Sequence, residues 1–208
     1  MKWLGIDEAG RGCVFGDLVV AGFAFNSDDH GVLTAAGATD SKKISSKKRD
    51  KARELLLQIG TPDIERITPA QIDAGNLNHL EEEAIIRLVK RAQPDHVIID
   101  ALGHPSTLPA TQARLAAAVA PLCPVWTIEP KADLNHPVCG AASIFAKTTR
   151  DHALAKLIEA HGPLGSGYPS DPKTREWISR YAQTRQPWPD FVRTRWGTIQ
   201  ALSQQTWA

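Results

Sequence analysis

The chain opens with Met1-Lys-Trp-Leu-Gly-Ile-Asp7-Glu8-Ala-Gly10-Arg11-Gly12, in which a short apolar segment runs into two carboxylates and a glycine-rich turn. The apolar residues at 3–6 predict a buried strand that ends beside Asp7. Successive strand side chains point to opposite faces, so Asp7 and Glu8 can face one site only if the chain already turns at Glu8. The glycines of the turn let backbone N–H groups approach a ligand closely. By itself, this segment fits either a solvated strand end or a site for a metal ion and phosphate.

Length and composition predict a globular protein. The chain has 208 residues, of which 42% are hydrophobic, which fits one large domain or a domain with an appendage. The sequence contains no run of about 18 apolar residues, and Met1 leads directly into the first strand without a secretion signal. We therefore expect a soluble cytoplasmic protein without membrane contact, and a monomer as the default.

Cysteines and histidines give no sign of a zinc site. Cys13, Cys123 and Cys139 are widely spaced and form no Cys-x-x-Cys pair, and the seven histidines include no His-Glu-x-x-His pattern. The three cysteines are expected to be buried thiols in a reducing compartment.

Charge is unevenly distributed along a chain whose formal net charge is only +1. Lysines and arginines are concentrated in residues 41–54 and again from Lys147 onward, whereas residues 81–83 are three consecutive glutamates. Basic ends around an acidic middle favour a binding surface for a polyanion. For the basic residues of 47–53 we prefer the alternative interpretation, a solvated helix face.

Hydrophobic periodicity predicts alternating strands and helices. Strands are expected over residues 14–25, 64–68, 96–100 and 125–129, and helices over 49–58, from Pro69, from Asn76 or Asn78, over 108–119 and over 138–160. The second strand should be antiparallel to the first because their connection is too short for a crossover. Further helices are expected after Ser170 or Asp171. We expect a core of residues 1–160 and, packed on it, a substrate-contacting loop and helical appendage at 161–208.

Acidic residues lie at or just beyond the ends of three predicted strands: Asp7 with Glu8, Asp100, and Asp133. Ligands of open α/β sheets collect at the carboxyl ends of strands, so these side chains can form one cluster. Clustered carboxylates repel one another unless a cation lies among them. Hard oxygen ligands select Mg²⁺ or Mn²⁺, and a pair of such ions is suited to phosphodiester hydrolysis.

The helix over residues 138–160 places Ser143, Lys147 and Arg150 on one face. Ser143 and Lys147 are expected to contact phosphate; without the acids, a polar helix flank would explain them equally well. Tyr168 follows Gly165-Ser-Gly167 in a constrained loop, where it could pack in the core or contact a sugar or base. Four tryptophans near the C-terminus are expected mainly to pack the appendage, with one stacking on nucleic acid.

Together these segments closely resemble ribonuclease HII, the type 2 ribonuclease H family. The resemblance runs in family order from residue 5 to about residue 175 and is carried by Gly5-Ile-Asp-Glu-Ala-Gly-Arg-Gly12, Asp40-Ser-Lys-Lys43, Val97-Ile-Ile-Asp100, Lys131-Ala-Asp133, Ala141-Ala-Ser-Ile-Phe-Ala-Lys-Thr-Thr-Arg-Asp151 and Gly165-Ser-Gly-Tyr-Pro-Ser-Asp-Pro172. It implies an α/β ribonuclease H-like fold, with a mixed five-stranded sheet flanked by helices. It also implies an endonuclease that acts on RNA/DNA hybrids and on ribonucleotides embedded in duplex DNA.

The resemblance also implies roles for individual residues. Asp7, Glu8, Asp100 and Asp133 would hold two Mg²⁺ or Mn²⁺ ions and orient the attacking water, and the cut 5′ of a ribonucleotide would leave 3′-hydroxyl and 5′-phosphate ends. Gly10, Arg11, Gly12 and Tyr168 would sense the ribose 2′-hydroxyl. The full set of expected substrate-binding residues is Gly10, Arg11, Gly12, Lys42, Lys43, Ser143, Lys147 and Tyr168.

Two residues depart from the family pattern, because Cys13 and Asp17 stand where proline is common. An altered loop there would affect the selectivity of Arg11 and Gly12 more than metal binding. Two alternatives stay open at this point: a non-catalytic nucleic-acid-binding protein, and another two-metal nuclease on the same fold.

Overall fold

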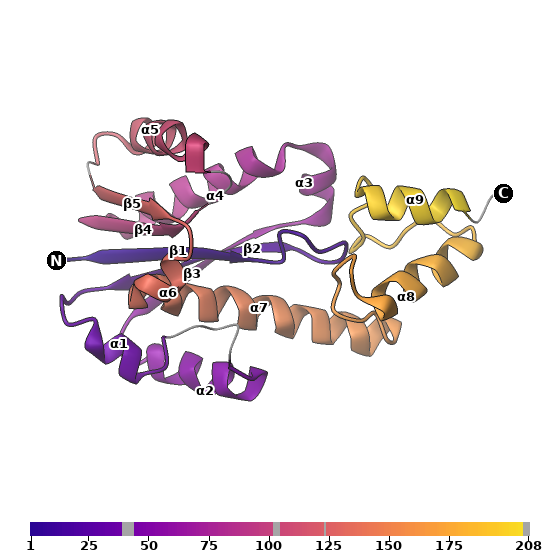
Figure 1. Cartoon of the computed structure of the whole chain (residues 1–208), viewed down its shortest axis with the longest axis horizontal. Helices are drawn as coiled ribbons and strands as arrows, with labels where there is room; N and C mark the ends of the chain where they lie inside the picture. Colours follow the sequence, from indigo (N-terminus) through magenta and orange to yellow (C-terminus); the bar gives the residue numbers. More distant parts are fainter. Residues whose placement is uncertain (39–43, 102–104, 123, 206–208) are drawn as a thin grey trace.

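The computed structural model describes residues 1–38, 44–101, 105–122 and 124–205. In it, a five-stranded sheet has the strand order β3-β2-β1-β4-β5 (Figure 1). The strands are β1 (Trp3–Ala9), β2 (Leu18–Phe25), β3 (Thr61–Ile67), β4 (His96–Asp100) and β5 (Val125–Glu129). The first three strands are antiparallel neighbours, and β1, β4 and β5 are parallel, so the predicted mixed five-stranded sheet is confirmed.

The parallel half of the sheet brings three strand ends to one edge. Ile6 of β1 is in register with Ile99 of β4, and Asp100 is in register with Glu129 of β5. The carboxyl ends of β1, β4 and β5 therefore meet, as expected for an open α/β sheet.

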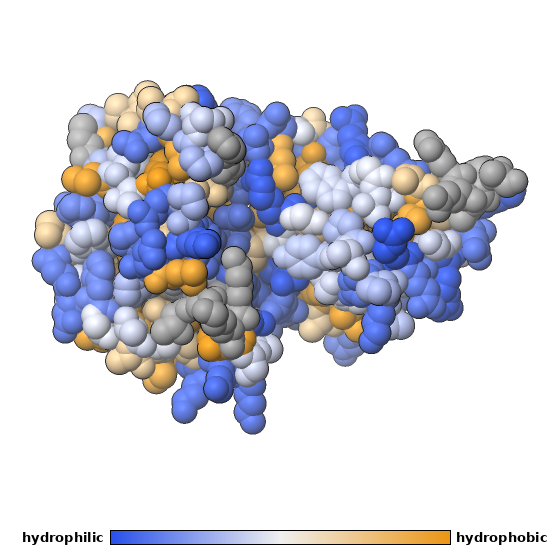
Figure 2. Space-filling view, in the orientation of Figure 1, coloured by the Kyte–Doolittle hydropathy of each residue, from blue (hydrophilic) through white to orange (hydrophobic). Residues whose placement is uncertain are grey.

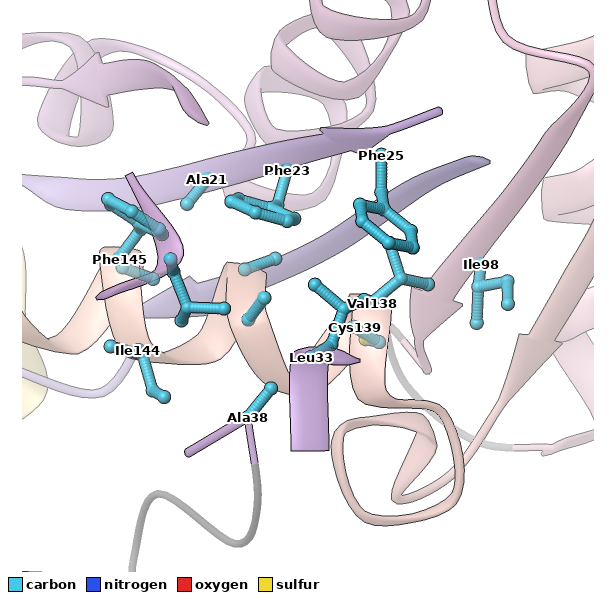
Figure 3. Close-up of a cluster of buried hydrophobic side chains, with 14 of the residues drawn as sticks. Ala21, Phe23, Phe25, Leu33, Ala38, Ile98, Val138, Cys139, Ile144 and Phe145 are labelled. Atoms are coloured by element: carbon cyan, nitrogen blue, oxygen red, sulfur yellow. The ribbon is translucent and has the colours of Figure 1, made fainter. Parts of the chain in front are cut away.

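One face of the sheet is covered by the long helix α7 (Pro137–His161), with α1 (Gly31–Ala35), α2 (Ser46–Leu56) and α6 (Ala132–Asn135) around it (Figure 1). Phe23 of β2 stacks on Phe145 of α7, with ring centroids 5.6 Å apart, within the cluster drawn in Figure 3. At Gly5, an added Cβ would lie 2.1 Å from the Val138 carbonyl oxygen. Only glycine therefore allows α7 to approach β1 so closely.

The opposite face is covered by α3 (Pro69–Ala74), α4 (Leu77–Ala92) and α5 (Leu108–Val119), the last preceded by a short 3-10 turn, η1 (Pro105–Thr107). Thr68 forms a capping box with Gln71 at the start of α3, and the Asn76 side chain accepts hydrogen bonds from two backbone N–H groups at the start of α4. Such caps satisfy donors that a helix leaves free at its N-terminus. They fix where each helix begins.

The C-terminal residues form a narrower lobe beyond the end of the sheet, containing α8 (Pro172–Gln183) and α9 (Gly197–Gln205) (Figures 1 and 2). A hydrophobic cluster of its own joins this lobe to the turn after β1, because Val14 and Phe15 pack there with Ile178 and Phe191. Trp177, Trp188 and Trp196 pack against the same cluster, as the sequence predicts for most of these tryptophans, whereas Trp207 lies outside the described residues.

The boundaries of β1, β2 and β3 differ from the sequence prediction, and β3 begins at Thr61, three residues before the predicted start. β1 continues through Glu8 to Ala9 because pairing with β2 extends to Val19, so the expected turn at Glu8 is wrong. β2 begins at Leu18 and not at residue 14, since Phe15 instead forms a bridge with Val192 of the C-terminal lobe.

Across the described ranges, no helix has both the length and the apolar character required to cross a membrane.

Candidate active site

Three of the predicted acids converge at the carboxyl edge of the parallel strands. Asp7 lies in β1, Asp100 ends β4, and Asp133 lies in α6 directly after β5; each offers a carboxylate oxygen within 4.8 Å of the others. Asp7 and Asp133 are buried, and Asp100 is partly buried. The sequence prediction that these strand ends form one carboxylate cluster therefore agrees with the geometry.

Backbone N–H groups orient the carboxylates. Asp100 Oδ1 accepts hydrogen bonds of 3.1 Å from the N–H groups of both Ala101 and Ala132, which tie the end of β4 to the start of α6. Lys131 has a φ of 64°, in the left-handed region, and this turn redirects the chain from β5 into α6. Asp7 Oδ1 accepts a hydrogen bond of 2.8 Å from the Glu8 N–H. The acids are thus held by rigid elements and not by a loose loop.

Lys147 and Ser143 reach the acids from α7. Lys147 Nζ lies 3.7 Å from Asp7 Oδ2 and 3.9 Å from Asp133 Oδ2, and it donates a hydrogen bond of 2.5 Å to Ser143 Oγ. Ser143 also hydrogen-bonds Asp7, and it is completely buried. This burial favours a role in orienting Lys147 and Asp7 over the direct phosphate contact that the sequence predicts for Ser143.

Glu8 reaches the site differently from the other three acids. Because β1 is still extended at this point, Asp7 and Glu8 point to opposite faces of the sheet, and the described cluster of three carboxylates lies beside Glu8 without including it. Both residues nevertheless line the same hollow. The role of Glu8 as a metal ligand therefore stays a prediction.

The surroundings of Asp7 and Glu8 disfavour the ionised form of both carboxyl groups. Burial raises the pKa of Asp7, and Lys147 partly offsets this effect. Burial and the neighbouring charge of Asp7 raise the pKa of Glu8 to about 8, against the opposing influence of Arg11. Carboxylates that are difficult to ionise together are a favourable environment for a divalent cation, which supplies the missing positive charge.

The Gly10-Arg11-Gly12 turn forms the rim of a hollow of about 190 Å³. Gly10 has a φ of 85°, a conformation that favours glycine, and its carbonyl accepts a hydrogen bond from the Cys13 N–H. The lining residues of the hollow are Asp7, Glu8, Ala9, Gly10, Arg11, Gly12, Asp100, Lys147, Arg150 and Tyr168.

Glu81 is a site residue that sequence reasoning missed. It is fully buried in α4, and its Oε2 forms an ion pair with Arg11 Nη1, while Arg11 Nη2 donates to Asn78 Oδ1. The Arg11 side chain is thus committed to α4 and fixes the turn. One signal was available: Glu81 lies on the apolar stripe of α4, four residues after Leu77, where an unpaired charge would be costly.

Tyr168 lies on the opposite rim of the hollow and is 38% exposed. The Arg150 guanidinium lies over its ring, 5.5 Å from the centroid, and a Cβ added at Gly12 would be 3.8 Å from the ring. Tyr168 therefore faces Gly12 across the hollow, the arrangement expected if both contact one group of a ligand. Lys42 and Lys43, the remaining predicted contacts, lie outside the described residues.

The residues fit a site for hard divalent cations. The cluster consists of carboxylate oxygens, whereas Cys13 and Cys139, the two cysteines within the described ranges, are buried free thiols. Oxygen-only ligands at an open hollow suit Mg²⁺ or Mn²⁺, which retain water and bind phosphate oxygens.

Comparisons with known proteins agree with this geometry. The family model of ribonuclease HII matches residues 4–199. The ribonuclease HII of Aeropyrum pernix is 38% identical over 205 residues, covering 96% of this chain and 89% of that relative. The structure of ribonuclease H2 from Pyrococcus horikoshii superposes with a TM-score of 0.90 at 32% identity, covering 99% of each chain.

A second solved structure, that of the PCNA:RNase HII complex from Archaeoglobus fulgidus, superposes with a TM-score of 0.85 at 33% identity and covers 96% of each chain. These likenesses confirm the predicted ribonuclease H-like fold. The match extends along nearly the whole chain and contains the acids, the glycine-rich turn and Tyr168. The chain therefore belongs to the ribonuclease HII family and is a ribonuclease H endonuclease.

Proposed function

We propose that this enzyme uses divalent metal ions to hydrolyse the RNA strand of RNA/DNA hybrids and to cut on the 5′ side of ribonucleotides embedded in duplex DNA. The products would carry 3′-hydroxyl and 5′-phosphate ends. The observation that carries the proposal is the convergence of Asp7, Asp100 and Asp133 within 4.8 Å, beside a hollow shared with Gly12 and Tyr168.

Asp7, Asp100 and Asp133 would hold Mg²⁺ or Mn²⁺, together with Glu8, which lines the same hollow. When bound, such ions activate a water molecule and neutralise the charge that develops on the scissile phosphate. Lys147, whose Nζ lies within 4.0 Å of both Asp7 and Asp133, partly offsets the rise in the pKa of Asp7 and is placed to contact a phosphate oxygen. Arg150 lines the same hollow and would position the phosphate backbone.

Selectivity for RNA requires recognition of the ribose 2′-hydroxyl, which distinguishes it from DNA at a given site. The Tyr168 hydroxyl, which also hydrogen-bonds the Cys13 side chain, and the backbone of Gly10, Arg11 and Gly12 line the same hollow and can donate to or accept from this group. Because Glu81 and Asn78 hold the Arg11 side chain, the turn meets the substrate mainly through its backbone.

The direct test uses duplex DNA that contains one ribonucleotide, with Mg²⁺ or Mn²⁺, and a matched all-DNA duplex as control. We expect a single cut 5′ of the ribonucleotide, no cut in the control, and no cut in the presence of EDTA. A parallel reaction with an RNA/DNA hybrid should yield short RNA fragments with 5′-phosphates.

Each failure of this test has a distinct meaning. Equal cutting of the ribonucleotide-containing and all-DNA duplexes would indicate a two-metal nuclease indifferent to the 2′-hydroxyl. Tight binding without hydrolysis in either metal, with hybrid also intact, would indicate a non-catalytic binding protein.

A further inference from the structure

Arg193 is completely buried, although it lies in an irregular segment between α8 and α9. A buried guanidinium is costly unless its donors are satisfied. In the described part of the chain, no carboxylate lies within 4.0 Å of it; its Nε and Nη1 donate to backbone carbonyl groups, and its Nη2 has no hydrogen-bond partner there. Its position therefore requires an explanation other than an ion pair.

The Arg193 side chain holds the turn that follows β1. Its Nη1 donates a hydrogen bond of 3.0 Å to the Arg11 carbonyl oxygen, and its Nε donates one of 3.0 Å to the Gly16 carbonyl oxygen. The backbone N–H of Arg193 donates to the Val14 carbonyl oxygen at 2.9 Å. Trp196 supports the guanidinium from the C-terminal side, with its ring centroid 5.4 Å from Arg193 Cζ. One residue of the C-terminal lobe thus fixes both ends of the segment 11–16.

The bond to the Arg11 carbonyl has a direct consequence for Gly12. The Arg11 C=O and the Gly12 N–H belong to one planar trans peptide unit, in which they point in opposite directions. Fixing the carbonyl toward Arg193 therefore also fixes the direction of the Gly12 N–H. Among the described residues, no group accepts a hydrogen bond from this N–H, and Gly12 lines the hollow opposite Tyr168.

The charge on Arg193 adds an electronic effect to the geometric one. Burial lowers the pKa of Arg193 to about 10, so the guanidinium stays charged at neutral pH. A charged donor on the carbonyl oxygen polarises the whole amide, which strengthens the N–H at its other end as a donor. This effect is larger in a buried environment than in water.

We propose that Arg193 is a positioning residue for ribonucleotide recognition, which aims and polarises the Gly12 N–H toward the ribose 2′-hydroxyl. The inference rests on the proposed function, because it assumes that this part of the hollow receives the ribonucleotide. It assigns to the C-terminal lobe a part in substrate selectivity, exerted through the backbone and without direct contact between Arg193 and substrate.

The test compares Arg193→Lys with the wild-type enzyme in a metal-free binding assay. Lysine keeps the charge but cannot reproduce the planar fork that spans two carbonyl groups. The measured quantity is the ratio of affinities for a duplex containing one ribonucleotide and the matched all-DNA duplex. We expect this ratio to fall about tenfold, the value of one good hydrogen bond, while affinity for the all-DNA duplex is unchanged. In Mg²⁺, kcat on the ribonucleotide substrate should fall more than KM rises.

Arg53→Lys is the matched control, because Arg53 is a partly buried arginine that bonds Thr148 and packs over Phe145 without touching the turn. It should lose some thermal stability and keep the wild-type affinity ratio. An Arg193→Lys enzyme that is folded and keeps the wild-type ratio would overturn the proposal. If the wild type itself neither discriminates nor cuts, the proposed function fails instead.

A second measurement avoids any dependence on folding of the variant. In the wild-type enzyme, the amide resonance of Gly12 should shift on binding the ribonucleotide-containing duplex and shift much less with the all-DNA duplex. Equal shifts with both duplexes would contradict the assignment of this N–H to the 2′-hydroxyl.

Discussion

The acidic residues that line the hollow and those at the outer edge of the sheet differ in how closely a basic side chain approaches them. At the edge, Arg91 Nε lies 2.6 Å from Asp63 Oδ2, and Arg87 Nε lies 2.8 Å from Glu65 Oε2, with both arginines nearly half exposed. In the hollow, Asp7 and Asp133 are buried, and Lys147 Nζ approaches them only to 3.7 and 3.9 Å.

The acids of the sheet edge lie in close ion pairs with exposed arginines, whereas the acids of the hollow are buried and have a more distant counter-charge in Lys147. Exposed ion pairs such as those of Arg87 and Arg91 contribute roughly 0–1 kcal/mol each. In the hollow, by contrast, burial raises the pKa values of Asp7 and Glu8, and neighbouring carboxylates add to the rise. A cluster of this kind reduces stability in the metal-free protein and gains it back when cations bind.

The largest difference in kcat is expected when one carboxylate is neutralised in each of the two regions. Asp100→Asn should lower kcat by about 1,000-fold or more, because a ligand of the proposed metal site is lost, while duplex binding is largely kept. Glu65→Gln, the same change at the outer edge, should leave kcat within about twofold. Near-normal turnover of Asp100→Asn would show that this carboxylate is not a metal ligand.

The second contrast concerns stability. Glu81→Gln leaves Arg11 without its buried counter-charge, and we expect it to lower the free energy of unfolding by about 2–4 kcal/mol. Glu65→Gln weakens the ion pairs of Glu65 with Arg87 and Arg91, whose side chains are nearly half exposed, and should cost about 1 kcal/mol. Urea denaturation of both variants measures this difference; equal losses would mean that the Arg11–Glu81 pair behaves like a surface ion pair.

A smaller effect is expected at the rim of the hollow. Tyr168→Phe removes one hydroxyl that can bond the substrate, so cutting at a lone ribonucleotide should fall about tenfold. Affinity for all-DNA duplex should stay at the wild-type value. A loss of affinity for every duplex would indicate instead that Tyr168 has a structural role.

Without metal, the stability of the protein should also depend on pH. Because the pKa of Glu8 rises from 4.5 in the unfolded chain to about 8, the folded protein binds more protons than the unfolded protein across that interval. The free energy of unfolding should therefore decrease as pH rises from 4.5 to 8. In EDTA we expect the melting temperature to fall as pH rises across this interval. Glu8→Gln should flatten the dependence; an unchanged slope would assign it to other groups.

Much of this architecture could be predicted from local sequence patterns. Strand ends at Asp7 and Asp100 and the acid after the fifth strand follow from apolar runs of characteristic length, and topology then brings them together. The boundaries of β1 and β2 were less predictable. They depend on pairing partners, since Glu8 stays extended opposite Val20 and Phe15 pairs with Val192.

The supporting residues Glu81 and Arg193 could not be identified from local patterns in the same way. Glu81 meets Arg11 from 70 residues away, and Arg193 meets the same turn across 182 residues. In the sequence, the first is one of three consecutive glutamates and the second one of several C-terminal arginines. Their roles depend on tertiary contacts that no local periodicity encodes.

The central claim is that Asp7, Asp100 and Asp133 form a binding site for divalent cations at the hollow. The most direct measurement is anomalous diffraction from crystals of this enzyme soaked in Mn²⁺. We expect a manganese peak within about 2.0–2.5 Å of oxygens from these three carboxylates. Manganese peaks elsewhere on the molecule, with none among these oxygens, would contradict it.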